Sequence, residues 1–405
     1  MSRSLRGALA AAAFPALLAG CDTAAVSDEV TVRDSAGVTI VENAASAAVP
    51  EWSIGAPTVS IGDIGQGEPY ELYEPLHGLR LDDGRIVLAN QGTRELRIFD
   101  PEGRHLRTVG RAGGGPGEFQ AMWGLVRLPG DSLGIWDWTA KRLTIYDDEG
   151  NFARLVTTAG EAGGFAPRLA GAFDDGTFVV LDGFDPTAVF GSGGGVREDS
   201  LALLRYDLDG QVVDSLGPYP GPARYVHLGE TGFWMRPVKF GRGEHLQVAA
   251  GRVFFGDDRT AEVRAFDRDG RLLRIVRLPH DPRAVTTDHL ARYRDQFLEG
   301  VPEDQLAQAR ERLEETPAAD RLPAFDDLFV DRLGRLWVEE FDGFTDRPDV
   351  WTVLGPDGRL LARLTLPPAV RPLDAGEDYL LTYERDDLDV EHVRLHPLRS
   401  EPPTG

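Results

Sequence analysis

The chain contains almost no cysteine, and this scarcity limits both its stabilising bonds and its chemistry. Cys21 is the single cysteine among 405 residues. One thiol cannot form a disulfide within the chain, so the folded protein must be stable without one. Lysine is nearly as scarce, with only Lys141 and Lys239. We interpret that scarcity as genomic composition rather than as a functional feature.

Positive charge is also in short supply. The chain has 66 acidic and 43 basic residues, which gives a formal net charge of -23. Binding to nucleic acid requires a positive field opposite the phosphates, so we expect no nucleic acid partner. The acidic residues are scattered rather than grouped in blocks, a distribution that is typical of a solvated protein surface.

Local motifs for catalysis and metal binding are missing. The eight histidines include no His-Glu-x-x-His or His-x-His pattern, and no Gly-x-Ser-x-Gly elbow occurs. The glycines of residues 113–117 are not followed by Lys-Ser/Thr, so they predict a turn between strands rather than a phosphate loop. Asp207 and Asp267 begin Asp-x-Asp-Gly sequences without the later oxygen ligands of a calcium loop, which favours tight turns. We therefore predict no cofactor, and leave open a divalent, calcium-like cation held by residues from distant strands.

What the chain does contain is a repeated phrase. A glycine turn leads through an alternating strand and a polar stretch into a second strand, which ends in an aromatic residue, an aspartate and a glycine turn. Clear copies occupy residues 83–103, 130–150 and 250–270, looser copies occupy 175–210 and 333–358, and a degenerate copy occupies 379–395. Because one such hairpin cannot bury its apolar face alone, neighbouring copies must stack. The spacing predicts an all-β fold, a β-propeller with six blades.

Two segments lie outside this pattern. Residues 30–32 and 37–41 precede the first copy, and we expect them to complete the C-terminal blade, because closing the ring removes exposed sheet edges. Residues 286–317 have a helical pattern instead. Thr287 or Asp288 can cap a first helix that ends at Gly300, and Pro302 suits the first turn of a second. This αα-hairpin either packs on the propeller as a structural element or forms a lid or docking element over one mouth.

The N-terminus has the pattern of a targeting segment. A basic start and a short apolar run end in Leu18-Ala19-Gly20-Cys21, which resembles the lipobox of bacterial lipoproteins. The resemblance implies cleavage before Cys21, lipidation of its thiol and attachment to the bacterial cell envelope, facing the periplasm or the exterior. Asp22 weakly favours the inner membrane. We therefore divide the chain into a signal peptide (1–20), a lipidated tether (21–29), the propeller (30–400) and a tail (401–405).

Three phrases resemble a known class of propeller. Residues 110–119 resemble the loop between blades of NHL-type propellers, and residues 330–338 are similar to the Val-x-Asp-x-x-Gly-x-Leu-Trp-Val phrase that occurs in them, with Val330 directly before Asp331. Residues 33–43 are similar to the opening of secreted bacterial six-bladed propellers. The resemblance, to the NHL/TolB-like propeller superfamily, implies the fold; that fold hosts binding modules, lyases, lactonases and sensors, so it does not select an activity.

Polar residues at the ends of the predicted strands are the candidates for a binding site. The candidates at the entrances of the inner strands are His77, Trp123, Arg168, His245 and Asp326. The candidates at the ends of the second strands are Asn90, Asp137, Asp182, Asp257 and Glu340. Such a rim could bind a cation or a cationic ligand. In the alternative, each acid accepts hydrogen bonds from the loop backbone of its own blade.

We therefore expect a lipid-anchored, extracytoplasmic propeller that acts as a ligand- or protein-binding module. Its partner would be an envelope protein or a small ligand at one face of the propeller. The alternative is a metal-dependent hydrolase, lactonase or lyase with its site in the central channel, for which no catalytic residue can be named. A third reading is a structural component of an envelope complex.

Overall fold

The structure, a computed structural model, describes residues 30–45, 49–63, 65–75, 77–158, 167–181, 193–229, 232–342 and 347–400. Strands dominate this part of the chain and two short helices interrupt them, which confirms the all-β expectation. No helix among these residues is long and apolar enough to cross a membrane. The predictions for residues 1–29, including Cys21, and for Asp182 lie outside the described residues.

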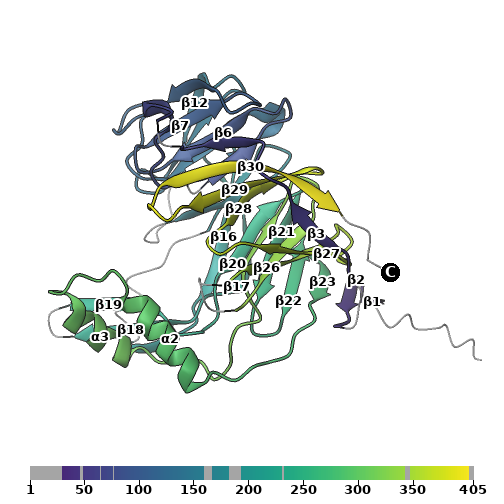
Figure 1. The fold of residues 1–405 in the computed structure, drawn as a ribbon. Coiled ribbons are helices and arrows are strands. Elements are labelled where there is room, and N and C mark those ends of the chain that lie inside the picture. The colour runs from purple at the N-terminus through teal and green to yellow at the C-terminus, as the bar shows by residue number, and fades with distance from the viewer. Residues whose placement is uncertain are drawn as a thin grey trace, which may run out of the picture.

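Most strands lie in two large sheets and two four-stranded sheets (Figure 1), and we divide them into six units, each a run of four strands paired antiparallel. Units 1 and 2 are separate four-stranded sheets, units 3 and 4 share a ten-stranded sheet with β1 and β2, and units 5 and 6 share a nine-stranded sheet with β3. Units 1 and 2 follow one another directly along the chain, and they contain β5 (His77–Arg80), β6 (Ile86–Asn90), β7 (Glu95–Phe99), β8 (His105–Val109), β9 (Met122–Arg127), β10 (Leu133–Asp137), β11 (Arg142–Tyr146) and β12 (Phe152–Thr157). Units 3 and 4 contain β13 (Arg168–Ala172), β14 (Phe178–Leu181), β16 (Ser200–Tyr206), β17 (Val212–Pro220), β20 (His245–Ala249), β21 (Arg252–Asp257), β22 (Glu262–Phe266) and β23 (Leu272–Arg277). Units 5 and 6 contain β24 (Phe325–Val330), β25 (Leu336–Glu340), β26 (Asp349–Leu354), β27 (Leu360–Leu366), β28 (Arg371–Ala375), β29 (Tyr379–Arg385), β30 (Glu391–Ser400) and β4 (Val59–Ile61).

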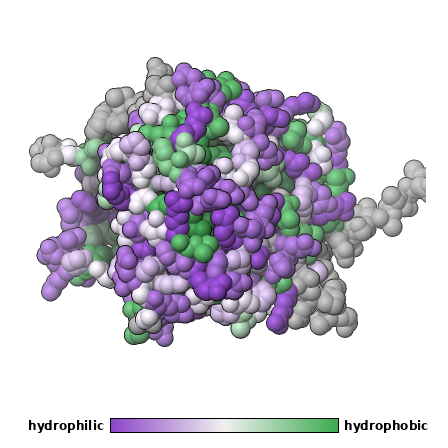
Figure 2. Space-filling view, turned by 90° about the horizontal axis from the view of Figure 1, so that it is seen from above, coloured by the Kyte–Doolittle hydropathy of each residue, from purple (hydrophilic) through white to green (hydrophobic). Residues whose placement is uncertain are grey.

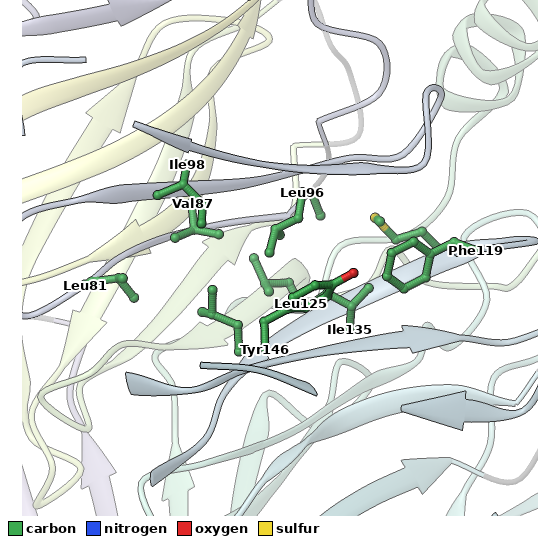
Figure 3. Close-up of a cluster of buried hydrophobic side chains, with 11 residues drawn as sticks. Leu81, Val87, Leu96, Ile98, Phe119, Leu125, Ile135 and Tyr146 are labelled. Carbon is green, nitrogen blue, oxygen red and sulfur yellow. The ribbon is translucent and has the colours of Figure 1, made fainter. Parts of the chain in front are cut away.

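Each pair of successive units shares a hydrophobic core. Along β6, Val87 and Ala89 pack toward unit 2, whereas Ile86 and Leu88 pack toward unit 6. The two faces of this strand are therefore both buried, because alternate side chains of a strand point to opposite faces. Figure 3 shows the core between units 1 and 2, in which Val87 and Ile98 face Leu125 and Tyr146. Equivalent cores lie between units 2 and 3, 3 and 4, 4 and 5, and 5 and 6.

The recurring aspartate before each glycine turn organises that turn. In Asp207, Oδ1 accepts hydrogen bonds from the backbone N–H groups of Asp209 and Gln211, at 2.9 Å each. Asp267 does the same two and four residues further along the chain. The same pattern recurs at Asp100, Asp147, Asp331 and Asp386. These carboxylates are occupied by turn backbone, so the prediction of tight turns rather than calcium loops is confirmed.

The N-terminal strand that completes the C-terminal unit is not the one predicted from residues 30–32 and 37–41. β2 (Val38–Asn43) pairs in parallel with β23 of unit 4, and β1 (Val30–Ser35) pairs with β2. The expectation that residues 30–41 complete the C-terminal unit is therefore wrong. β4 completes unit 6 by pairing with β30, and β3 (Glu51–Ile54) pairs with both β27 and β30. Ile61 of β4 is fully buried in the core between units 6 and 1, whereas Val41 of β2 is buried beside unit 4 and Val32 of β1 is 45% exposed.

A separate lobe lies away from units 1 and 2 (Figure 1). It contains β15 (Gly195–Arg197), β18 (Arg224–Gly229), β19 (Gly232–Pro237), α2 (Thr287–Leu298) and α3 (Leu306–Glu315). The predicted helical hairpin is confirmed. Its cap is Thr286, whose hydroxyl accepts from the N–H of His289, and α3 begins at Leu306 rather than near Pro302. The three-stranded sheet of β15, β18 and β19 was not predicted.

Hydrophilic residues cover most of the face that Figure 2 shows, and hydrophobic residues form separate patches between them. The scattered acidic residues of the sequence are consistent with this solvated surface.

Replacing Ile61 tests the role of β4. We expect Ile61→Ala to lower the free energy of unfolding by about 2–4 kcal/mol, because it leaves a cavity in a core shared by the two ends of the chain. The matched control Val32→Ala changes an exposed strand residue and should cost less than about 0.5 kcal/mol. Urea unfolding of both variants measures the difference. Equal effects would show that β4 does not join the chain ends.

Candidate functional site

The first strands of the units carry the candidates predicted at strand entrances. His77, Arg168 and His245 are the first residues of β5, β13 and β20. Trp123 and Asp326 are the second residues of β9 and β24, and both lie in β-bulges. The first strands of successive units 1 to 5 contact one another, and β28 contacts β5. Bulges re-aim side chains, and the bulge at Asp326 places this residue in the lining of the pocket between units 4 and 5.

The candidates at the ends of the second strands differ in their hydrogen-bond and ion-pair partners. Asn90 accepts from the N–H of Tyr73 at 2.7 Å, and Asp137 accepts from the N–H of Gln120 at 2.7 Å. Both are fully buried, so they cap loops of their own units, as in the alternative interpretation. Asp257 pairs with Arg242 at 3.3 Å. Glu340 accepts from the hydroxyl of Thr352 at 2.9 Å.

Three of the sequence candidates line one pocket of about 420 Å³ between units 4 and 5 and the lobe. They are His245, Asp326 and Glu340. The pocket is strongly acidic, because its lining also includes Asp258, Glu339, Asp342 and Asp349. Its aromatic lining consists of Phe240, Tyr293, Phe325 and Phe341. A pocket with this combination of carboxylates and aromatic faces suits a cation better than an anion.

Three of the pocket carboxyls hold their protons unusually strongly. Burial raises the pKa of Glu339 to about 8, and the charges of Asp349, Asp326 and Asp327 add to the effect. Burial, with further neighbouring acids, also raises the pKa of Asp326 and of Asp349 to about 6. Asp326 is exposed to the solvent of the recess, whereas Glu339 and Asp349 are half-buried, so the effect of burial is firmest for Glu339. Like charges cannot all ionise together in such a recess, so part of this cluster is uncharged near pH 7.

A buried histidine–aspartate pair forms another part of the lining. His245 Nε2 lies 3.1 Å from Asp258 Oδ2, which also accepts from the N–H of Gly243 at 2.7 Å. Asp258 is 2% exposed, and its Oδ1 has no hydrogen-bond partner among the described residues. An unpartnered carboxylate oxygen in a buried position is costly, and a donor from a bound molecule would remove that cost.

The lobe contributes the outer wall of the pocket. Tyr293 of α2 lies 5.3 Å from Phe240 between ring centroids, and Phe240 lies 6.0 Å from Phe341. The Arg236 guanidinium of β19 is 3.7 Å from the ring centroid of Phe297 on α2. The helices thus pack on the unpredicted β18–β19 hairpin and place Tyr293 and Gln296 at the pocket. The hairpin also packs through Leu290 and Tyr293 on the cluster of Phe240, Leu322 and Phe341, so its role as a structural element or as a lid stays a prediction.

The remaining candidates lie around the same first strands without lining this pocket. Arg168 forms an ion pair with Glu244, which Arg224 also approaches at 3.7 Å. Burial and the nearby charge of Arg371 lower the pKa of His77 to about 4. Trp123 is 39% exposed. A binding role for each of these residues stays a prediction.

Sequence reasoning missed Glu339, Asp349 and Asp258. Glu339 and Glu340 are adjacent, and both line the pocket. Their positions depend on how β24 and β25 pair around the bulge at Asp326. One sequence signal could have indicated these acids. The repeat predicts that the strand with Asp326-Asp327 pairs with the strand that contains Glu339-Glu340, which brings two acidic pairs close together. Their convergence with the lobe could not be read from the sequence.

In the described part of the chain, no group of three or more His, Cys, Asp or Glu side chains is arranged to hold a metal ion. The metal-dependent alternative therefore has no ligand set among these residues.

Comparisons with known proteins add little. No family model matches the chain, and no curated protein matches it. Among solved structures, a protein from Bacteroides fragilis thought to be exported has a TM-score of 0.49 and 9% identity, covering 89% of this chain and 99% of its own. A gluconolactonase from Xanthomonas campestris has a TM-score of 0.38 and 15% identity, covering 85% and 88%. A virginiamycin B lyase from Staphylococcus aureus has a TM-score of 0.43 and 9% identity, covering 87% and 100%. With TM-scores below 0.5, none of these likenesses supports an inference about this chain.

The raised pKa of Glu339 predicts how stability depends on pH. The folded state keeps a proton that the unfolded state releases, so the stabilisation is complete below pH 4.5 and is lost as the pH rises through about 8. Glu339→Gln should match the wild type near pH 4.5 and be more stable by about 1–2 kcal/mol at pH 8, after screening by water in the pocket.

Urea unfolding from pH 4.5 to 8.5 measures this difference. The matched control is Glu340→Gln, whose carboxylate is 46% exposed and lies 3.4 Å from Arg363. That variant should not flatten the pH dependence. Parallel stability curves for Glu339→Gln and the wild type would show that Glu339 titrates normally.

Proposed function

We propose that this chain is a lipid-anchored, extracytoplasmic six-bladed β-propeller that binds a small organic cation in the acidic pocket beneath the α2–α3 lobe. The six blades would be units 1 to 6. The ring is supported by the six shared cores, of which the last connects unit 6 to unit 1. The lipid anchor is supported by the sequence around Cys21 alone. An envelope protein as a further partner stays a prediction.

The observation that carries the binding proposal is the set of carboxyls with raised pKa in one pocket. Asp326, Glu339 and Asp349 form no ion pair with any described residue, and the nearby charges of Arg371 and His245 offset the rise in the pKa of Glu339 and Asp326 only in part. Groups whose pKa values are strongly shifted by burial and by neighbouring charges are often found at functional sites. A cation in the pocket would remove the repulsion among these carboxylates and favour ionisation of all three groups.

The aromatic residues of the lining argue for an organic cation rather than a metal ion. Phe240, Tyr293 and Phe341 are packed edge to face beside the acids. Aromatic faces attract ammonium groups and exclude water around their alkyl parts. The unpartnered Oδ1 of Asp258 supplies a further acceptor for an N–H donor. The volume of about 420 Å³ is large enough for a small molecule.

Binding of a cation should be coupled to proton release. The groups whose charges act on Glu339 are Asp326, Asp327, Asp349 and Arg371. An ammonium ion requires Glu339 to ionise, so affinity should increase by up to about tenfold per pH unit between pH 6 and 8 and level off above pH 8. Calorimetric titration with cadaverine, a primary alkyl diamine, at constant ionic strength measures this dependence.

Two variants complete the experiment. Glu339→Gln should weaken cadaverine binding by about tenfold and abolish most of its pH dependence. The control Asp209→Asn removes an exposed carboxylate in a turn, which pairs with Arg154 at 3.1 Å, and should bind as the wild type does. Cadaverine binding that is absent, or that is equally strong in both variants and independent of pH, would contradict the proposal.

A further inference from the structure

Arg371 is a cationic residue whose charge has no ion-pair partner among the described residues. It is the first residue of β28, and Ala369, two residues earlier, lines the acidic pocket. Its side chain is exposed, and it forms no hydrogen bond or ion pair with the residues that the structure describes. β28 belongs to unit 6, which follows the unit that carries Asp326 and Glu339. The pocket lining thus reaches to within two residues of Arg371, although Arg371 itself is not part of that lining.

Other arginines of the first units show what a structural role looks like. Arg97 donates to the carbonyl groups of Pro69 and Glu71 and pairs with Glu95. Arg142 donates to the carbonyl of Gly114 at 2.8 Å and to that of Glu118 at 2.5 Å. Both are buried and hold loops in place. Arg371 has none of these contacts, so a loop-holding role does not explain it.

The charge of Arg371 nevertheless reaches the pocket. It acts on Glu339 and Asp327, where it opposes the rise in pKa, and on His77 of unit 1, where it adds to the effect of burial. Glu339 and Arg371 are thus close enough to interact but do not form an ion pair. An anion that entered here would meet a guanidinium group that no carboxylate occupies.

We propose that the ligand of the acidic pocket is a zwitterion, with its ammonium group among Asp326, Glu339 and Asp349 and its carboxylate against Arg371. This inference rests on the proposed function, because the ammonium part of the ligand is the cation proposed above. Amino acids and compounds with a free amino acid headgroup belong to this class. Opposite charges on protein and ligand would be paired at both ends, which gives specificity against simple amines.

The physical reason for selectivity is the pairing of opposite charges. A simple amine would bind the carboxylates but face the unpaired positive charge of Arg371. A ligand that also has a carboxylate would neutralise that charge with a planar, two-point contact, which guanidinium groups form well. The carboxylate should therefore improve binding, even though the pocket as a whole is acidic.

A matched pair of probes tests this inference. L-Lysine and cadaverine have the same carbon chain and two amino groups, and differ by one carboxylate. We expect wild-type protein to bind L-lysine at least about tenfold more tightly than cadaverine at pH 8 in calorimetric titrations. Arg371→Gln should abolish this preference and bind cadaverine as tightly as the wild type or more tightly. Arg371→Lys, which keeps the charge, should retain part of the preference.

The control is Arg154→Gln, which removes an exposed arginine whose side chain is 45% exposed and should leave both affinities unchanged. Thermal melting of each variant verifies folding. If cadaverine binds but L-lysine binds no better, the zwitterion inference is overturned and the cation site stands. If neither probe binds, the proposed function itself is overturned.

Discussion

The packing of successive four-stranded units against each other is the constraint on which the rest of the structure depends. No unit has a core of its own. Val87 packs toward unit 2 while Leu88 packs toward unit 6, and the same division recurs in the other units. A unit without its neighbours would expose both faces of its central strands to water. This dependence explains why the last core must combine strands from the two ends of the chain, including β4.

The same packing creates the site. When the units pack side by side, their first strands contact one another. Glycine permits the closest of these approaches: a Cβ atom at Gly171, which has a φ of +142°, would lie only 2.0 Å from the carbonyl oxygen of Val248. Side chains at the starts of these strands are thereby concentrated in a small volume. The acidic pocket and the nearby Arg371 follow from this arrangement, because charges that are far apart in the sequence are brought together without forming ion pairs.

The lobe changes how strongly water hydrates the carboxylates of the pocket. Without α2, the carboxylates of Asp326 and Glu339 would be better hydrated, and their repulsion would be weaker. Tyr293 and the packed rings of Phe240 and Phe341 exclude water from one side. The helical hairpin and the β18–β19 hairpin are inserted at different points of the chain, and neither would form this wall alone. The insertions therefore add Tyr293 and Gln296 to the lining and reduce the hydration of carboxylates that come from the units.

The sequence by itself determined the turns, the strands and the helical hairpin. Asp207 and Asp267 form tight turns because Asp and Gly have local backbone preferences, and Thr286 to Glu315 folds as two helices because its apolar spacing is helical. Even the missed hairpin has a local signal, since the sequence Gly-Glu-Thr-Gly at 229–232 separates two segments rich in aromatic and β-branched residues. The tertiary structure alone decided that β4 rather than β2 completes unit 6, and that Glu339 lines the pocket while Asn90 and Asp137 cap loops. These choices depend on burial between strands that are distant in the sequence, and local preferences carry no information about which distant surfaces will meet.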